Sequence, residues 1–286
     1  MKDQAHKLRQ QFSRIQHHTE AKTIAVASGK GGVGKSNFVL NFALTLTEKS
    51  KKVLIFDLDI GMGNIDILLG LHPKKSIVDL FEENTAIHEI IEHSPYGLAY
   101  IAAGSGLASV FQLDDAKMEY FFHQLQLILN DYDYIFFDMG AGVTNHSLAF
   151  VLAADEAIIV TTPEPTAITD GYAMIKHIMR HPGSPPIYIV MNRVSSHKVG
   201  EQTMNRLQQV VSRFLYKQIY PLGLLPDDSI VSKAVIQQIP FTKYREHAKV
   251  SKRLRGIVSN YLGYIAPKQK EQRNFVTKLK QLIRER

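Results

Sequence analysis

The sequence predicts an α/β protein with a doubly wound, mainly parallel β-sheet that is flanked by helices. Apolar runs rich in β-branched residues recur along the 286 residues, and stretches long enough for helices separate them. Strands that are apolar along their whole length belong to parallel sheets covered on both faces. Small, acidic or amide residues end several of these runs, which places polar chemistry at one edge of the expected sheet.

The expected strands follow one another in chain order, each with its own apolar run. They are TIAVAS (23–28), KVLIFDLD (52–59), a weaker GLAYIAA (97–103), YIFFDMG (134–140), AIIVTTP (157–163) and IYIVMNR (187–193). Ligands of open parallel sheets bind beyond the carboxyl ends of the strands. We therefore expect the functional site where these runs end, at Ser28-Gly29, Asp57-Leu58-Asp59, Asp138, Thr162-Pro163 and Asn192-Arg193.

The run SGKGGVGKSN (28–37) predicts a loop that binds phosphates. Residues 29–36 fit GxxxxGK[ST] between an expected strand and an apolar-periodic helix, which is the context that this motif requires. Glycines let backbone N–H groups turn toward phosphates at a helix N-terminus. Lys35 would reach the β- and γ-phosphates, and the Ser36 hydroxyl would bind Mg²⁺. The expected nucleotide contacts in the loop are Gly29, Lys30, Gly31, Gly32, Val33, Gly34, Lys35, Ser36 and Asn37.

Three carboxylates at strand ends predict Mg²⁺-dependent hydrolysis of the nucleotide. Asp138 stands in the position of a Walker-B carboxylate, acting on Mg²⁺ directly or through water. We expect Asp59 to orient the attacking water and Asp57 to support the metal shell, so the expected metal set is Ser36, Asp57 and Asp138. The alternative is that such an aspartate only caps the turn that follows its strand.

The strand end at residues 192–195 favours adenine as the base. Guanine-specific phosphate-loop proteins use an Asn-Lys-x-Asp run whose last carboxylate pairs with guanine, and this chain has Ser195 in that place. We expect Asn192 to hydrogen-bond the base and Arg193 to stack on it. Pro226 and Asp227, in the run LPDD (225–228), would close the pocket. The predicted cofactors are therefore ATP and Mg²⁺.

A second lysine, Lys30, stands five residues before Lys35, where its side chain cannot easily fold back onto the same γ-phosphate. The run KGGVGKS (30–36) resembles the signature of the MinD/ParA family of deviant Walker-A ATPases, which belongs to the SIMIBI class of P-loop NTPases. The resemblance extends over residues 23–242 through DLDIGMGNIDILLG (57–70), DMGAG (138–142) and TTPEPTAITDGY (161–172). This chain departs from the family pattern at Asn37, where a second Thr is usual, and at Met139-Gly140.

The resemblance implies a MinD-like fold, slow regulatory ATP hydrolysis and an ATP-bound homodimer. Lys30 would cross the interface to the partner's ATP, so the implied catalytic set is Asp59, Lys30 and Lys35. The alternative is that Lys30 is an ordinary solvent-exposed lysine with no role at an interface. The residues implied in dimer contacts and switching are Asn64, Asp66, Gly142 and Glu164.

Composition restricts the other chemistry that the chain can carry. It has no cysteine, which excludes disulfides, thiolate zinc sites and iron–sulfur ligation by cysteine. Residues 1–22 carry five basic and two acidic side chains and residues 243–286 carry thirteen and three, so the total of +7 leaves residues 23–242 at −6. An acidic body argues against a broad nucleic-acid surface, whereas the basic end suits DNA, anionic lipid or an acidic protein. No apolar leader or bilayer-spanning run is visible, so we expect a cytoplasmic protein.

The last segment, RNFVTKLKQLIRER (273–286), predicts an amphipathic helix. Basic residues beside its apolar stripe are typical of a helix that lies in an anionic membrane interface. We therefore expect peripheral binding to the inner face of the cell membrane, and an ordinary helix packed on the core is the alternative. The expected membrane residues are Phe275, Val276, Leu279, Leu282 and Ile283.

The run KDQAHKLRQQF (2–12) is a second helical segment, placed before the ATPase body. It resembles the DQAxxLR element of the FlhG (YlxH) family of MinD-like ATPases. That resemblance implies an arm that stimulates the SRP-type GTPase FlhF, and a protein that regulates flagellar number and placement and binds flagellar C-ring components. The matching residues are Asp3, Gln4, Ala5, Leu8 and Arg9.

The expected organisation has three parts: an arm over residues 1–20, a MinD-like ATPase domain over 23–267 and a membrane-targeting helix over 268–286. Two other function classes stay open on the sequence. A ParA-like partition ATPase would use the basic C-terminal region for nonspecific DNA, with binding that falls steeply with salt. A metabolic ATPase on the same fold, such as a small-molecule ligase, is the third.

Overall fold

The structure is a computed structural model that describes residues 20–59, 63–82, 85–104, 115–142, 145–263 and 274–284. The expected arm, with Asp3, Gln4, Ala5, Leu8 and Arg9, lies outside the described residues except for Glu20. In this part of the chain no helix is long and apolar enough to cross a membrane.

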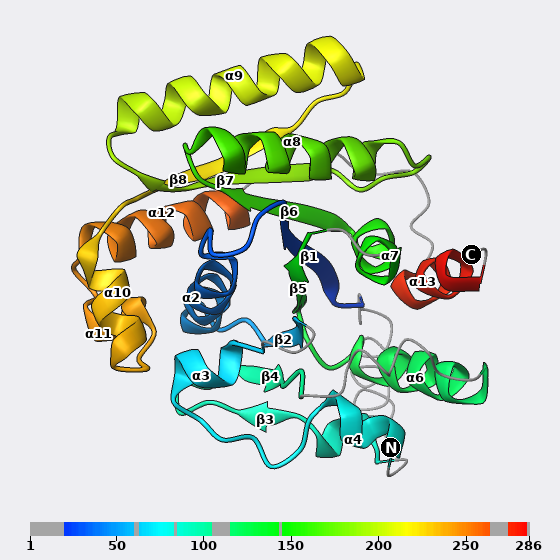
Figure 1. Cartoon of the computed structure of the whole chain (residues 1–286). Helices are drawn as coiled ribbons and strands as arrows, with labels where there is room; N and C mark the ends of the chain where they lie inside the picture. Colours follow the sequence, from blue (N-terminus) through cyan, green and yellow to red (C-terminus); the bar gives the residue numbers. More distant parts are fainter. Residues whose placement is uncertain are drawn as a thin grey trace, which may run out of the picture.

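One sheet of eight strands forms the centre of the molecule, in the order β3-β4-β2-β5-β1-β6-β7-β8 (Figure 1). All neighbouring strands are parallel except β3 and β4, which pair in the antiparallel direction. The strands are β1 (Lys22–Ser28), β2 (Val53–Leu58), β3 (Glu92–His93), β4 (Ala99–Ile101), β5 (Tyr134–Ala141), β6 (Glu156–Thr161), β7 (Ile187–Val194) and β8 (Tyr220–Pro226).

The doubly wound, mainly parallel sheet confirms the expected fold class, and all six expected strands are present. β3 and β8 are additions that the sequence pattern did not predict. β8 reads YPLGLLP, and its two prolines and glycine disfavour a central strand. It lies at the edge of the sheet, where a missing backbone N–H costs little.

Helices cover both faces of the sheet and bury two apolar cores (Figure 1). One core takes side chains from α4, α6, α7, α8, α9 and α13, and the other from α2, α3, α10, α11 and α12. The helices are α2 (Lys35–Glu48), α3 (Ile65–Leu69), α4 (Ile77–Glu82), α6 (Asp115–Ile128), α7 (Asn145–Ala153), α8 (Pro165–Met179), α9 (His197–Leu215), α10 (Ser229–Ile236), α11 (Phe241–Tyr244), α12 (Lys249–Gly263) and α13 (Phe275–Arg284), with a short 3₁₀ turn, η1 (Ile87–Glu89).

Aromatic side chains fill both cores. Phe137 packs edge-on against Phe150 on one face of the sheet, and Phe42 packs edge-on against Phe136 on the other. Burying each such ring stabilises the fold by roughly 1.5–3 kcal/mol. Because β2, β5, β1, β6 and β7 are covered on both faces, their carboxyl ends are fixed close together.

A buried polar group fixes α12 at the opposite end of the sheet. The carboxylate of Glu156 lies 2.6 Å from the Lys22 Nζ atom, and the Tyr261 hydroxyl donates to it at 2.6 Å. Burial and the Glu156 charge raise the pKa of Tyr261 well above its ordinary value, so the hydroxyl stays protonated. This ion pair lies at the amino ends of β1 and β6. The candidate functional site lies at the carboxyl ends of the strands, at the opposite end of the sheet.

Candidate functional site

The predicted phosphate loop lies between the end of β1 and the start of α2. Gly32 and Gly34 adopt φ values of 75° and 90°, a region that side chains with a Cβ atom disfavour. A Cβ atom on Gly29 would lie 2.2 Å from the backbone of Asp170 in α8, so only glycine fits there. The first turn of α2 leaves backbone N–H groups without helical partners, and these face anions favourably.

Lys35 and Asp138 form a buried ion pair at the centre of the site. The Lys35 Nζ atom lies 2.5 Å from Asp138 Oδ1, and the two side chains are 6% and 0% exposed. A buried charge needs its partner, because an unpaired one is strongly destabilising. Phosphates bound in the loop would compete with Asp138 for the lysine, so the pair is the resting arrangement of these two groups.

The same carboxylate offers a place for Mg²⁺. Asp138 Oδ2 is buried and has no hydrogen-bond partner among the described residues, whereas a buried carboxylate oxygen ordinarily has one. The Ser36 hydroxyl lies beside it, 3.3 Å from Lys35 Nζ. Hard oxygen donors of this kind fit Mg²⁺, which keeps several waters and takes the rest of its shell from phosphates. Ser36 and Asp138 therefore fit the ion as expected.

Asp57 holds the segment that carries Asp59. Its Oδ1 atom accepts the backbone N–H of Asp59 at 3.0 Å, and Oδ2 accepts those of Asn64 at 2.9 Å and Ile65 at 3.2 Å. Both oxygens are thus engaged by the backbone on either side of residues 60–62. The expected support of the metal shell by Asp57 stays a prediction, and the backbone contacts are a role that the sequence did not indicate.

Burial and the charge on Asp138 raise the pKa values of two neighbouring carboxyl groups, Asp57 and Asp59. Burial, and then the charge on Asp138, raise the pKa of Asp57 to about 7, against the effect of its three backbone hydrogen bonds. Burial also raises the pKa of Asp59, with Lys35 opposing and Asp138 adding to the shift. A perturbed group in a concave site is typical of catalytic centres, and here both groups stand beside the phosphate loop.

Addition of Mg²⁺ to the ADP-bound protein at pH 7 is expected to release up to about half a proton from Asp57. A pKa of about 7 leaves this carboxyl partly protonated at that pH, and a nearby cation favours the charged form. The release should shrink at pH 8.5, where the carboxyl is already ionised. Titration calorimetry in two buffers of different ionisation enthalpy measures it, and an equal proton count in Asp57→Asn would contradict the assignment.

Lys30 is held by its own chain through two contacts with the start of α8. Its Nζ atom lies 3.4 Å from Glu164 Oε2 and 3.0 Å from Thr166 Oγ1. The Lys30 and Glu164 side chains are 42% and 61% exposed, and such a pair contributes little to stability. The lysine is therefore available to another charge. Thr166 was not among the expected site residues, although it follows Glu164 by two positions in the run TTPEPT.

Two of the expected switch residues, Gly142 and Asp66, have described hydrogen bonds. Gly142 has a φ of 83°, and its N–H donates to the carbonyl of Ser28 at 3.1 Å, which ties the end of β5 to the phosphate loop. Asp66, half-buried in the first turn of α3, accepts the N–H of Ile67. At the Met139-Gly140 departure, a Cβ atom on Gly140 would lie 3.1 Å from Asp59 Oδ1, so a larger residue there would have to displace that side chain slightly.

A cavity of about 650 Å³ extends from the loop to the expected base pocket. It brings together the expected nucleotide contacts Gly34, Asn37, Asn192, Arg193, Pro226 and Asp227. Its apolar walls were not predicted, because they come from distant segments: Phe38, Leu225, Val231, Val235, Ile236, Phe241 and Val250. A cavity that combines apolar walls with polar groups can hold a nucleotide base and fix its orientation.

Asn192 lies at this cavity but already has internal partners. Its Nδ2 group donates to the carbonyl of Val33 at 2.8 Å, and its Oδ1 atom accepts the N–H of Arg193 at 2.9 Å. The amide thus ties the end of β7 to the phosphate loop. The expected hydrogen bond from Asn192 to the base would have to use the second N–H of Nδ2 or the second lone pair of Oδ1.

The expected membrane stripe is packed on the protein. Phe275, Val276 and Leu279 are buried against α7 and α6, and the Phe275 ring stacks on Phe137 at a centroid distance of 4.7 Å. Leu282 and Ile283 are partly buried in the same core. This conformation is the stated alternative, a helix packed on the core, and membrane binding by the stripe stays a prediction because burial of apolar area against the core competes with burial in lipid.

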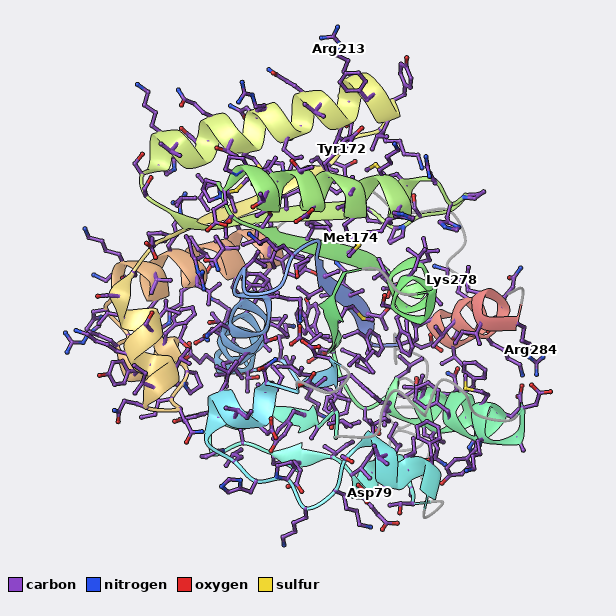
Figure 2. The ribbon with its side chains drawn as sticks, viewed as in Figure 1. Asp79, Tyr172, Met174, Arg213, Lys278 and Arg284 are labelled. Carbon is purple, nitrogen blue, oxygen red and sulfur yellow. The ribbon has the colours of Figure 1, made fainter. Side chains whose placement is uncertain are left out.

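Two of the three basic residues of α13 are also paired internally. Lys280 lies 2.6 Å from Glu119 of α6, and Arg284 binds the same carboxylate. Figure 2 shows Lys278 and Arg284 on the solvent side of α13. These pairs lower the pKa of Glu119 chiefly through the Lys280 hydrogen bond, so the carboxylate stays charged and keeps both partners.

Comparison with known proteins places the chain among nucleotide hydrolases. Residues 21–182 match the family described as an AAA domain. The antiactivator FleN of Pseudomonas aeruginosa is 35% identical over 217 residues, 76% of this chain and 78% of that protein. The flagellum site-determining protein YlxH of Helicobacter pylori is 36% identical over 215 residues, 75% of this chain and 72% of that protein.

Solved structures agree with the architecture. The septum site-determining protein MinD of Pyrococcus horikoshii, complexed with Mg-ADP, has a TM-score of 0.69 at 21% identity, covering 84% of this chain and 96% of that one. A chain of the MinC:MinD cell division protein complex of Aquifex aeolicus has a TM-score of 0.71 at 25% identity, covering 87% of this chain and 99% of that one. Because the sequence likeness spans most of two relatives and the fold is that of MinD, the chain belongs to the FleN/YlxH (FlhG) family of MinD/ParA-type ATPases.

Proposed function

We propose that this protein is an ATP-switched dimer that regulates flagellar number and placement from the inner face of the cell membrane. The observation that supports the dimer is Lys30, which belongs to the phosphate loop and whose Nζ atom has two weak surface contacts among the described residues. The flagellar role rests on the two relatives described as an antiactivator and as a flagellum site-determining protein.

The residues at the loop support slow hydrolysis of ATP. Asp59 follows the last residue of β2, and its pKa is raised by burial, which suits a group that orients and polarises a water. Lys35 would leave Asp138 for the phosphates, and Ser36 and Asp138 would hold the metal. Mg²⁺, when bound, neutralises charge on the β- and γ-phosphates. Lys30 of one subunit would complete the partner's site, so turnover would require the dimer.

Membrane binding requires α13 to leave its place on α6 and α7. The apolar stripe faces Phe137 and Phe150, and Glu119 neutralises two of the basic residues that an anionic surface would attract. We propose that the monomer keeps the helix docked and that the ATP-bound dimer presents two released helices. Two helices bind one surface more tightly than one, which couples ATP to the membrane.

Glu119→Gln is expected to increase flotation with anionic liposomes in ADP, because the docked helix loses two ion pairs while the lipid-facing charges remain. Wild type should float in ATP and much less in ADP, and a chain ending at Lys268 should not float. Glu201→Gln on α9, whose only described ion pair is with His197, is the matched control. Flotation of Glu119→Gln no greater than that of the control would contradict the docking role.

The DNA-partition alternative is tested in the same experiment. Double-stranded DNA is added in parallel to each protein at two salt concentrations. Binding to DNA without flotation, falling steeply with salt, would move the protein to the partition class. The apolar stripe of α13 favours lipid, since a helix that lies on phosphates gains nothing from five apolar side chains on one face.

Two partner contacts complete the proposal. The arm at residues 1–20 would stimulate an SRP-type GTPase, FlhF. The exposed end of α9 would dock flagellar C-ring components, because Phe214 and Tyr216 are 62% and 90% exposed there, beside the outward-pointing Arg213 (Figure 2). Exposed aromatic residues next to an arginine are typical of protein interfaces.

Removal of residues 1–19 is expected to leave basal ATP hydrolysis unchanged and to abolish stimulation of the GTPase. The deletion ends before Glu20, where the described fold begins, so the ATPase body keeps its contacts. A GTP-turnover assay with purified GTPase and each form of the protein measures the effect. Full stimulation by the shortened chain would refute the role of the arm.

A further inference from the structure

Three polar side chains form a continuous buried chain behind the nucleotide cavity. Thr242 of α11 donates its backbone N–H and its hydroxyl to Asn41 Oδ1, at 3.0 and 2.8 Å. Asn41 Nδ2 then donates to the carbonyl of Asn37 at 2.9 Å and to Asn37 Oδ1 at 3.3 Å. Asn41 and Thr242 are fully buried, and Asn37 lines the cavity.

The donor and acceptor roles in this chain are determined by its two fixed ends. A backbone N–H can only donate, so the atom of Asn41 that faces Thr242 must be the oxygen. A backbone carbonyl can only accept, so the atom of Asn41 that faces Asn37 must be the nitrogen. The oxygen of the Asn37 amide is therefore the end turned to Asn41, which leaves its N–H₂ group as the end turned away.

We propose that Asn41, fixed by Thr242, is a positioning residue that makes Asn37 a hydrogen-bond donor to the α-phosphate of the bound nucleotide. Asn37 lies two residues after Lys35 on the first turn of α2, between the phosphate loop and the base pocket. The nucleotide group that belongs there is the α-phosphate, whose oxygens only accept. The inference rests on the assignment of the site to ATP.

The proposal gives a physical reason for asparagine at a position where the family usually has threonine. A threonine hydroxyl rotates freely and can donate to a phosphate without help. An amide has a donor end and an acceptor end, and the wrong end would repel a phosphate. The Thr242–Asn41 pair removes that ambiguity, and it also connects the phosphate end of the site to α11, which contributes Phe241 to the cavity wall.

Titration calorimetry with ADP and Mg²⁺ on four full-length proteins tests the donor. Asn37→Ala is expected to weaken ADP binding about tenfold, as removal of one hydrogen bond to a charged group would. Asn37→Thr restores a donor and should stay within about threefold of wild type. Asn37→Asp keeps the shape but turns an anion toward the phosphate, and should bind at least about tenfold more weakly than Asn37→Ala. Threonine no better than alanine would overturn the proposal.

A double-mutant cycle tests the positioning role of Asn41. If Asn41 acts through Asn37, then Asn41→Ala should weaken ADP binding in wild type and change it little in the Asn37→Ala background. Equal losses in both backgrounds would overturn the role. If Asn41→Ala does not fold, Thr242→Val takes its place in the cycle, because this change removes only the hydroxyl that holds the Asn41 amide. Thr45→Val is its matched control, since this buried hydroxyl bonds the backbone carbonyl of Asn41 and not its amide.

Failure of this inference can be told apart from failure of the proposed function. Wild type that binds no ADP would remove the ATP assignment itself. Wild type that binds ADP while the Asn37 variants bind equally well would leave the ATPase in place and remove only the donor. Melting temperatures of the ligand-free proteins, recorded for every variant, separate lost binding from lost folding.

Discussion

Lys30→Ala is expected to lose the ATP-dependent dimer and to keep ATP binding. The phosphate loop, Lys35 and the base cavity are all intact without the Lys30 side chain, whose described contacts are with Glu164 and Thr166 only. In the dimer the same ammonium group would face the partner's phosphates. Removing one partner of a buried interfacial charge pair costs about 2–5 kcal/mol, so dimerisation should weaken at least about 30-fold.

Light scattering after size exclusion, with ATP and Mg²⁺ present, measures the dimer, and calorimetry measures the affinity for ATP. Lys49→Ala is the matched control, because Lys49 is an exposed lysine at the opposite end of α2. A Lys30→Ala dimer as tight as that of wild type would refute the role of the lysine. Loss of ATP binding in the variant would instead assign Lys30 to its own subunit's nucleotide.

Asp59→Ala is expected to retain the ATP-bound dimer and to lose turnover by about 10²–10⁴-fold, the range that a positioned base contributes. Asp59 is only half-buried, and its N–H remains available to Asp57 in the variant, so the segment before α3 keeps its anchor. Because hydrolysis is what would dissolve the dimer, the variant should stay dimeric longer than wild type after ATP is mixed in.

Single-turnover measurements of phosphate release, run beside light scattering, check both halves of this expectation. Asp131→Asn serves as the control, because that carboxylate pairs with His88 and lies before the start of β5, whereas the site lies at the carboxyl ends of the strands. Turnover within a few-fold of wild type would exclude Asp59 as the group that orients the water. A variant that is monomeric in ATP would mean that Asp59 supports the interface and not the chemistry.

The positions of the glycine loop and of the strand-end carboxylates could be predicted from local sequence, and their roles stay predictions. The loop and the carboxylates are close in sequence to the elements that place them, so pattern and spacing were sufficient. The hydrogen bonds of Asp57 could not be predicted, because they come from the backbone N–H groups of residues 64 and 65, whose approach is a property of loop geometry. The side-chain composition of a strand end does not encode that approach.

Contacts between segments that are far apart in the chain could not be predicted from the sequence. Thr242 meets Asn41 across 201 residues, and no period or motif relates them. The stripe on α13 predicts that one face is covered, since its apolar residues recur at helical spacing, but Phe137 and lipid satisfy the same pattern equally well. β8 was not predicted because Pro221 and Pro226 are unusual in strands. An edge strand tolerates them, since it needs backbone N–H donors on one side only.

The ion pair between Lys35 and Asp138 imposes an order on how the site fills. A divalent cation that arrives alone must compete with an ammonium group already seated on its carboxylate, in a place that water barely reaches. A nucleotide that arrives first would draw the lysine onto its phosphates and uncover Asp138. Free metal would therefore bind the resting protein more weakly than the nucleotide-loaded protein, and nucleotide would bind before metal.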